Sequence, residues 1–227
     1  MSKGPEGEAS EFFGSRHQLT RALVNEEQIP ISSRITAYED ARQIIRNSSF
    51  RAVTMCYCRH KKEHLGDRCR KNAPVEGICM VLGEGARFLV RRGFAQERSV
   101  GQMLDTLDHT RSLGLTHVTD NVREQPSFIC NCCRCCCGNS VENMIAPIIN
   151  ATNYLAVIDA DRCIGCGICV EKCHSGAALL NAYGKAHRVK DHCIGCGVCA
   201  SFCPENAISL LEGQRTVRIA PQRGKSA

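Results

Sequence analysis

Residues 163–203 contain one short cysteine pattern twice, and this repeat constrains the fold more than any other feature of the chain. The first copy reads C-I-G-C-G-I-C-V-E-K-C from Cys163 to Cys173, and the second reads C-I-G-C-G-V-C-A-S-F-C from Cys193 to Cys203. Each cysteine of the first copy has a counterpart thirty residues later. Thiols that recur every third residue suit a metal cluster and suit disulfides with one another poorly.

The spacing of each copy, C-x2-C-x2-C-x3-C, is that of a [4Fe–4S] site. Where two such runs occur together, the fourth cysteine of each run reaches the cluster of the other run. We therefore expect two [4Fe–4S] clusters with ligands exchanged across the repeat. Cluster 1 is predicted to bind Cys163, Cys166, Cys169 and Cys203, and cluster 2 to bind Cys193, Cys196, Cys199 and Cys173.

Four glycines alternate with these cysteines and are predicted to shape the cluster loops: Gly165, Gly167, Gly195 and Gly197. Glycine adopts left-handed turns and allows close approach of the backbone. Neighbouring N–H groups are then free to point at sulfur atoms, which stabilises the reduced, more negative form of a cluster.

Residues 154–212 closely resemble the bacterial two-cluster ferredoxins, in all eight cysteines and in the glycines between them. The resemblance implies an internally two-fold α+β fold and low-potential electron transfer. Proline usually follows the fourth cysteine in that family. Pro204 fits this pattern, whereas His174 occupies the equivalent position in the first copy. His174 is either a group that tunes the neighbouring cluster or an exposed residue at a helix start.

Ten further cysteines precede the repeat, more than ordinary core packing explains. Cys56, Cys58, Cys69 and Cys79 have the right number for a third cluster. The C-N-C-C-x-C-C-C stretch adds further candidate ligands: Cys130, Cys132, Cys133, Cys135, Cys136 and Cys137. Three interpretations are open. They are one or more additional Fe–S clusters, an all-cysteine zinc site, which usually uses C-x2-C knuckles, and free redox-active or persulfide-carrying thiols.

Residues 37–212 as a whole also resemble a group of iron–sulfur proteins from anaerobes. The shared features are C-x-C-R at Cys56–Arg59, two spaced cysteines, G-L-x-H ending at His117, the C-N-C-C-x-C-C-C stretch and a two-cluster ferredoxin. This resemblance implies a redox role and leaves the partner open. Arg59 and Arg134 lie beside the cysteines in sequence, and they either offset thiolate charge or lie on solvated surface.

The predicted fold class is α+β. We expect a mobile leader at 1–14, a cysteine-rich N-terminal domain at 15–151, a pseudo-symmetric ferredoxin-type domain at 152–213 and a basic tail at 214–227. Capping patterns predict helices at about 16–27, from Thr36 to Asn47, and from Ser99 to Gly114; residues 85–92 are also predicted to be helical. Strands are predicted at 51–58, 115–119, 155–158 and 208–211, a turn-rich segment at 59–76 and an apolar linker at 144–149.

Composition limits which cellular compartment and which classes of binding partner are expected. The first ten residues are polar, and no apolar run approaches the roughly 20 residues of a membrane span, so we expect no membrane span and a reducing cytoplasm. The formal charge is +6, but a [4Fe–4S] core with four thiolates carries about −2. Two clusters lower the total to about +2, which does not favour a nucleic-acid partner.

Several catalytic signatures are missing from the sequence. It has no C-x3-C-x2-C triplet, no G-x4-G-K-[ST] phosphate loop and no G-x-S-x-G elbow. The main hypothesis is therefore an electron carrier that relays single electrons to a partner redox protein or oxidoreductase subunit. Two alternatives are an Fe–S-dependent enzyme that uses the thiols of residues 130–137, and a redox-sensing DNA-binding regulator.

Overall fold

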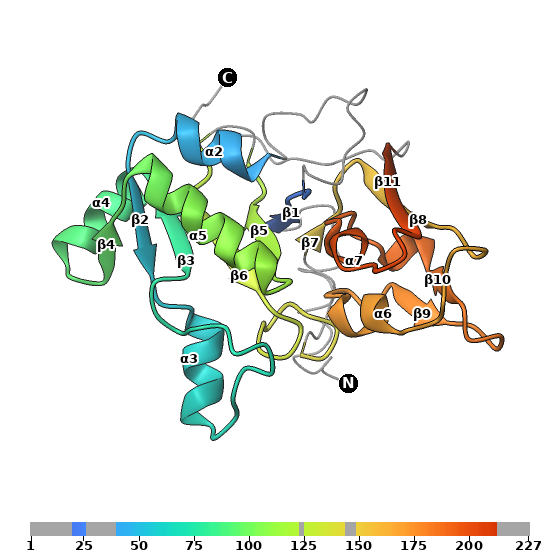
Figure 1. The fold of residues 1–227 in the computed structure, drawn as a ribbon. Helices are drawn as coiled ribbons and strands as arrows, with labels where there is room; N and C mark the ends of the chain where they lie inside the picture. Colours follow the sequence, from blue (N-terminus) through green and yellow to red (C-terminus); the bar gives the residue numbers. More distant parts are fainter. Residues whose placement is uncertain (1–19, 26–39, 123–124, 144–148, 213–227) are drawn as a thin grey trace, which may run out of the picture.

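The computed structural model describes residues 20–25, 40–122, 125–143 and 149–212. Within these residues helices and strands are mixed along the chain, as the α+β prediction requires (Figure 1). We call residues 20–150 the N-terminal region and residues 151–212 the C-terminal region. The predicted leader, the predicted tail and most of the predicted linker lie outside the described residues.

The N-terminal region is built on one seven-stranded sheet with the order β4-β2-β3-β6-β5-β1-β7. Neighbouring strands are antiparallel except for β1 and β7, which are parallel. The strands are β1 (Thr20–Ala22), β2 (Arg51–Thr54), β3 (Cys79–Leu82), β4 (Ala95–Glu97), β5 (Thr116–Asp120), β6 (Phe128–Cys132) and β7 (Ile149–Asn150).

Two helices, α2 (Ala41–Asn47) and α5 (Val100–Ser112), cover one face of this sheet (Figure 1). The predicted capping box starts α5, because Ser99 accepts the N–H of Gln102 and the Gln102 side chain accepts the N–H of Ser99. The apolar faces of both helices pack on the strands in one core: Leu23, Ala41, Ile44, Ile45, Val53, Met80, Leu82, Met103, Leu107 and Ile129.

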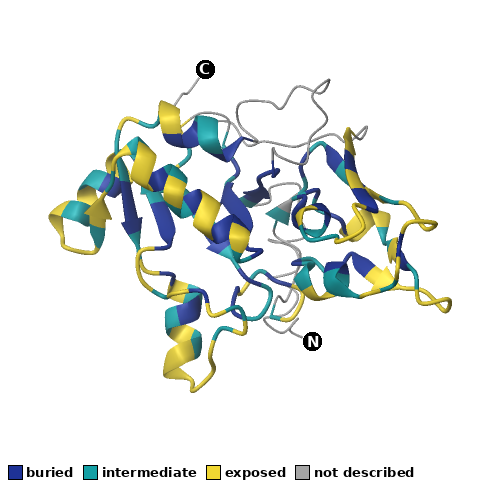
Figure 2. Ribbon diagram, viewed as in Figure 1, coloured by how far each residue is buried: buried dark blue, intermediate teal, exposed yellow. Residues whose placement is uncertain are grey.

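Two other helices lie at the edges of the N-terminal region. α4 (Gly83–Arg91) follows β3 and packs against β2, β3 and β4. α3 (Tyr57–His64) extends away from the sheet, and its tip is exposed (Figure 2). Arg59 is the buried residue of α3, so this helix carries one cation into the interior.

The C-terminal region contains two small antiparallel sheets and short helices. β8 (Tyr154–Ile158) pairs with β11 (Ile208–Glu212), as the first and closing strands predicted there, and β9 (Ala178–Leu180) pairs with β10 (Ala186–Arg188). Between them lie α6 (Ile168–Lys172), the short 3-10 helix η2 (Lys190–His192) and α7 (Val198–Ser201). Cysteines make up much of the core here, together with small residues, since several alanines are buried beside them.

The two regions are in direct contact. The segment after β1 reaches the second cysteine run, where Asn25 donates its backbone N–H to the Cys196 carbonyl (3.0 Å) and its side chain to Ser201 Oγ (2.5 Å). On another side, the Val141 N–H donates to the His174 carbonyl (3.0 Å). The cysteine-rich part of the N-terminal region therefore lies against the C-terminal region.

The predicted helix at about 16–27 is wrong where the structure describes it, because Thr20–Ala22 form strand β1. β1 pairs with β5 on one side and β7 on the other. Arg21, Leu23 and Val24 are all buried. A short apolar run fits a buried strand as well as a helix. Here hydrogen-bonded pairing with a strand on each side stabilises the strand.

Two further boundaries differ from prediction. Helix α2 ends at Asn47 as expected, but its N-cap is Asp40, whose side chain accepts from the N–H groups of Arg42 and Gln43; Thr36 lies outside the described residues. Strand β2 ends at Thr54, and the next residues turn into α3, so Cys58 lies on a helix. Of the segment predicted to be turn-rich, residues 59–64 belong to this helix, since Lys and Glu are strong helix formers. Residues 65–76 contain turns and no helix or strand, as predicted.

The remaining expected elements of the N-terminal region are confirmed with small shifts. α4 covers the segment predicted as 85–92, α5 ends before Gly114, and β5 covers the strand predicted at 115–119. None of the helices in the described ranges combines the length and the apolarity that crossing a bilayer requires.

The core beneath α5 gives the first testable prediction. Leu107 is fully buried, so Leu107→Ala should lower the free energy of unfolding by about 2–5 kcal/mol through lost burial and a cavity. Leu104 on the same helix is only partly buried, and Leu104→Ala should cost less. Anaerobic denaturant unfolding followed by far-UV circular dichroism measures both. Equal losses for the two variants would contradict the described packing.

Candidate metal centres

The first cysteine run is joined by the last cysteine of the second. Cys163, Cys166 and Cys169 line one small pocket, and Cys203 lines the same pocket from the other end of the repeat. The backbone N–H of Ala186 donates to Cys163 Sγ (3.4 Å), and that of Ala207 donates to Cys203 Sγ (3.2 Å). The residues predicted for cluster 1 therefore face one another across the fold.

The second cysteine run has the last cysteine of the first run, Cys173, as its neighbour. Burial raises the pKa of Cys196 to about 12, and the nearby thiols of Cys173 and Cys193 raise it further. Burial also raises the pKa of Cys199, again with Cys196 and Cys173 among the neighbouring charges. The Ala177 N–H donates to Cys173 Sγ (3.2 Å), as the Ala207 N–H does to Cys203. Cys173 thus lies among the residues predicted for cluster 2.

The loops that carry these cysteines depend on glycine at two close approaches. Gly165 has φ +72°, and a Cβ there would collide with the carbonyl oxygen of Gly184. Gly195 has φ +69°, and a Cβ there would collide with Thr152 and with the carbonyl oxygen of Tyr154. Gly167 and Gly197 are the N-caps of α6 and α7. Larger residues at the two tight positions would push the cysteine loops outward.

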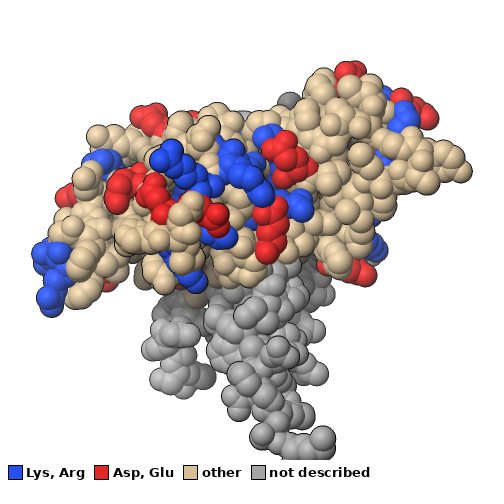
Figure 3. All heavy atoms as spheres, turned by 90° about the horizontal axis from the view of Figure 1, so that it is seen from below, with Lys and Arg blue, Asp and Glu red and all other residues tan. Residues whose placement is uncertain are grey.

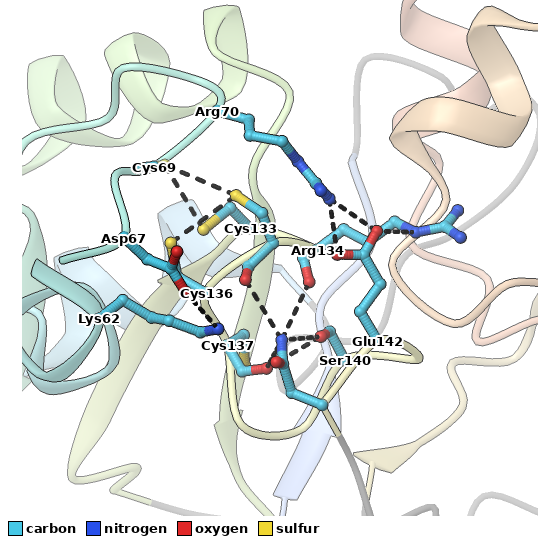
Figure 4. Close-up of polar contacts among 12 residues, drawn as sticks. Lys62, Asp67, Cys69, Arg70, Cys133, Arg134, Cys136, Cys137, Ser140 and Glu142 are labelled. Carbon is cyan, nitrogen blue, oxygen red and sulfur yellow. Dashed lines mark hydrogen bonds and ion pairs between the residues drawn. The ribbon is translucent and has the colours of Figure 1, made fainter. Parts of the chain in front are cut away.

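The ten N-terminal cysteines fall into two groups, and the first is a compact four-thiol group. Its members are Cys69, Cys133, Cys135 and Cys136, whose Sγ atoms all lie within 4.8 Å of one another. Cys69 comes from the loop after α3, and the other three from the turn after β6. Figure 4 shows the sulfur atoms of Cys69, Cys133 and Cys136 pointing toward one another.

The second is a six-thiol group: Cys56, Cys58, Cys79, Cys130, Cys132 and Cys137. All six line a cavity of ≈ 180 Å³, and Cys133 and Cys136 of the four-thiol group line part of the same cavity. Neighbouring thiols around this cavity interact with one another. Hydrogen bonding with Cys130 raises the pKa of Cys79 to about 12, and hydrogen bonding with Cys137 raises the pKa of Cys58. Interaction with Cys132 lowers the pKa of Cys137. Six thiols in one cavity are enough ligands for a metal cluster.

This grouping differs from the predicted third-cluster set. Cys56, Cys58 and Cys79 lie in the six-thiol group, whereas Cys69 lies in the four-thiol group. The C-N-C-C-x-C-C-C stretch serves both. Side chains alternate between the two faces of a strand. Cys130 and Cys132 therefore lie on one face of strand β6, and the buried residues Ile129 and Asn131 lie on the other.

Arg59 is not solvated surface, because it is 2% exposed and lies between the two groups. Burial lowers the pKa of Arg59, but the neighbouring thiols of Cys56, Cys133 and Cys69 outweigh this effect and raise it. Its Nη2 donates to the carbonyl of Asn131 (2.7 Å). A buried guanidinium is costly unless negative charge lies nearby. Arg59 therefore fits the prediction of an arginine that offsets thiolate charge.

Arg134 connects the cysteine-rich turn to the C-terminal region. Its Nη1 donates to the carbonyls of Val170 (2.6 Å) in α6 and of Cys173 (3.3 Å) at the end of this helix, and its Nε donates to Glu142 (2.9 Å). Arg70 also pairs with Glu142 (2.5 Å), so one carboxylate joins two arginines (Figure 4). Sequence reasoning missed Glu142, because a single acidic residue in a turn carries no pattern.

His174 is 2% exposed, so it is not an exposed residue at a helix start. It lies near Cys137 of the six-thiol group and lowers the pKa of that thiol, after the larger effects of Cys132 and Cys58. His117, by contrast, has its Nδ1 2.6 Å from Asn131 Oδ1 and lies in the sheet. His174 is therefore the histidine that links the repeat to the N-terminal cysteines.

The two glycines of the first cysteine loop provide a matched prediction. Gly165→Ala should lower the iron content of anaerobically purified protein by about half of the iron that two clusters hold. The reason is that the added Cβ would collide with a backbone carbonyl oxygen. Gly167→Ala has a similar φ of +76° but nothing within 4 Å, so it should retain the iron. Iron analysis of both variants measures this. Equal iron loss would show that backbone strain alone, and not the close approach, controls the loop.

Comparison with known proteins agrees with this geometry. Residues 156–210 match a family described as a 4Fe-4S dicluster domain. The match spans all eight cysteines of the repeat. No curated protein matches the chain. The cysteines and the N–H groups that donate to sulfur fit such clusters, so the C-terminal region is similar to an iron–sulfur dicluster domain.

Proposed function

We propose that this protein transfers single electrons through two [4Fe–4S] clusters to a partner redox protein or oxidoreductase subunit. The observation that carries the proposal is the exchange of cysteines across the repeat. Cys203 lines the pocket of the first run, and Cys173 lies among the thiols of the second. The dicluster match supports an iron–sulfur electron-transfer role.

The ligand assignment follows from this exchange. Cys163, Cys166, Cys169 and Cys203 hold cluster 1, and Cys193, Cys196, Cys199 and Cys173 hold cluster 2. When bound, such clusters supply reversible one-electron chemistry. The chain contributes N–H donors to the sulfur atoms, for example from Ala177, Ala186 and Ala207. Donors of this kind stabilise negative charge and so affect the reduction potential.

The cluster 1 end is the contact surface for the redox partner in this proposal. Among the eighteen cysteines, all within the described residues, Cys166 is the exposed one. Apolar side chains lie exposed near it in the chain or on the β9–β10 hairpin, including Ile164 (62%) and Tyr183 (89%). Figure 3 shows mostly uncharged surface at the end formed by the C-terminal region. An apolar contact around an exposed ligand suits a transient electron-transfer complex.

The cluster 2 end faces the interior, and we propose that the six-thiol group there holds an additional Fe–S cluster. His174 follows the cluster 2 ligand Cys173 in the chain and lies near Cys137. The cavity of ≈ 180 Å³ is lined by more thiols than one cluster requires. An electron on cluster 2 would thus have a short covalent and contact path to a third centre.

The same cavity favours one second candidate, an enzyme that uses the thiols of residues 130–137. A site with room beside its ligands admits a small molecule more readily than a closed one. The two functions differ in where electrons go: a carrier returns all the electrons it accepts, whereas an enzyme consumes them in a product. The DNA-binding regulator stays a prediction without a structural observation that favours it.

Paired substitutions test the exchange of ligands. Cys163→Ala combined with Cys203→Ala removes two ligands of one proposed cluster, so the double variant should lose about four irons. Cys193→Ala combined with Cys203→Ala removes one ligand from each cluster, and it should lose about eight. Anaerobic iron and sulfide analysis with EPR of the reduced protein distinguishes these results.

The reverse pattern would overturn the assignment. If the Cys193 and Cys203 pair lost about four irons and the Cys163 and Cys203 pair about eight, each run would bind its own cluster. The Cys203→Ala single variant serves as the control, since it should retain one cluster with its EPR signal.

A further inference from the structure

The four-thiol group differs from every other set of cysteines in how closely its sulfur atoms approach. Cys69 Sγ lies 3.7 Å from Cys133 Sγ and 3.8 Å from Cys135 Sγ, and Cys135 Sγ lies 3.7 Å from Cys136 Sγ. Cys133 and Cys136 are buried, and the other two are half-buried. Four thiols from two separate segments thus converge on one point.

These separations match the ligand shell of a single tetrahedral ion. Zinc binds thiolate sulfur at about 2.3 Å, and tetrahedral geometry then places the ligands about 3.8 Å apart. A [4Fe–4S] cube needs wider spacing, because each thiolate binds a different corner iron. Within the described residues, neither the repeat cysteines nor the six-thiol group has three sulfur atoms that close together. The compact spacing is therefore specific to this group.

The surroundings of the four-thiol group contain groups that offset negative charge. The backbone N–H groups of Lys71 and Ala73 interact with the Cys69 sulfur. Buried Arg59 lies beside Cys69 and Cys133. Backbone donors and a buried cation offset part of the negative charge that four thiolates and one divalent ion leave.

We infer that Cys69, Cys133, Cys135 and Cys136 bind one zinc ion. Binding displaces the thiol protons, and the four sulfur atoms complete the coordination shell. A closed shell leaves no position for water or substrate, so the ion is structural and carries no electrons. This site is distinct from the two clusters of the proposed function and from the cluster proposed for the six-thiol group.

The position of the site indicates what the ion holds together. Cys69 anchors the loop whose next residues, Arg70 and Lys71, contact Glu142 and the carbonyl of Gly114 (3.1 Å). The turn that supplies the other three ligands also contains Arg134, which donates to the end of α6. The ion therefore fastens the loop after α3 to the turn that contacts the C-terminal region.

Two matched variants test the inference on the full-length chain, loaded anaerobically with iron, sulfide and zinc. Cys69→Ala should lose about one zinc per chain and keep its iron. Cys132→Ala, from the six-thiol group, should keep the zinc. Mass-spectrometric metal analysis measures both. Loss of iron with retention of zinc in Cys69→Ala would overturn the inference. A fall in iron in Cys132→Ala tests the proposed third cluster separately.

A second measurement covers the case in which Cys69→Ala does not fold. Zinc X-ray absorption of the wild-type protein should give four sulfur neighbours at about 2.3 Å. Substitution by Co²⁺ should give the visible spectrum of a tetrahedral tetrathiolate ion. Nitrogen or oxygen neighbours, or wild-type protein without stoichiometric zinc, would overturn the inference.

Discussion

The structure depends on cysteine thiolates that converge in the interior, where their negative charges require metal cations. Without such ions, neighbouring thiols share protons: the pKa of Cys137 is lowered by Cys132, while the pKa of Cys132 is raised well above its usual value by Cys130 and Cys137. All of them can be thiolates together only when a metal compensates the charge. Metal binding and folding of the cysteine-rich parts are therefore coupled, and both should weaken together as pH falls.

This coupling explains how a region with so small an apolar core is held together. The core of the C-terminal region consists largely of cysteines and alanines, with Tyr154, Ile208 and Leu210 as its larger buried members. Metal sites act as internal cross-links in such cores. The contact with the N-terminal region adds a second source of order, through Asn25 at the second cysteine run and Arg134 at α6.

The proposed electron path has one exposed end, at Cys166, and one buried end, at His174.

The sequence predicted the parts of the structure that local patterns determine. Fixed cysteine spacing identified the dicluster region, and the Ser99–Gln102 box located α5. It did not predict how the ten other cysteines divide, because Cys69 joins three residues that follow it by more than sixty positions. Only the pairing of strands β3, β5 and β6 brings these segments together. The strand at Thr20–Ala22 was missed for the same reason, since its partners lie far along the chain.

The most direct test of the central claim is stepwise anaerobic reduction of the full-length protein, with the electrons counted and each step followed by EPR. The proposed function predicts one electron taken up per cluster, EPR signals from at least two interacting [4Fe–4S] centres, and complete return of the electrons to an added one-electron acceptor. Protein that contained iron but took up no electrons reversibly, or that kept them in a chemical product, would contradict it.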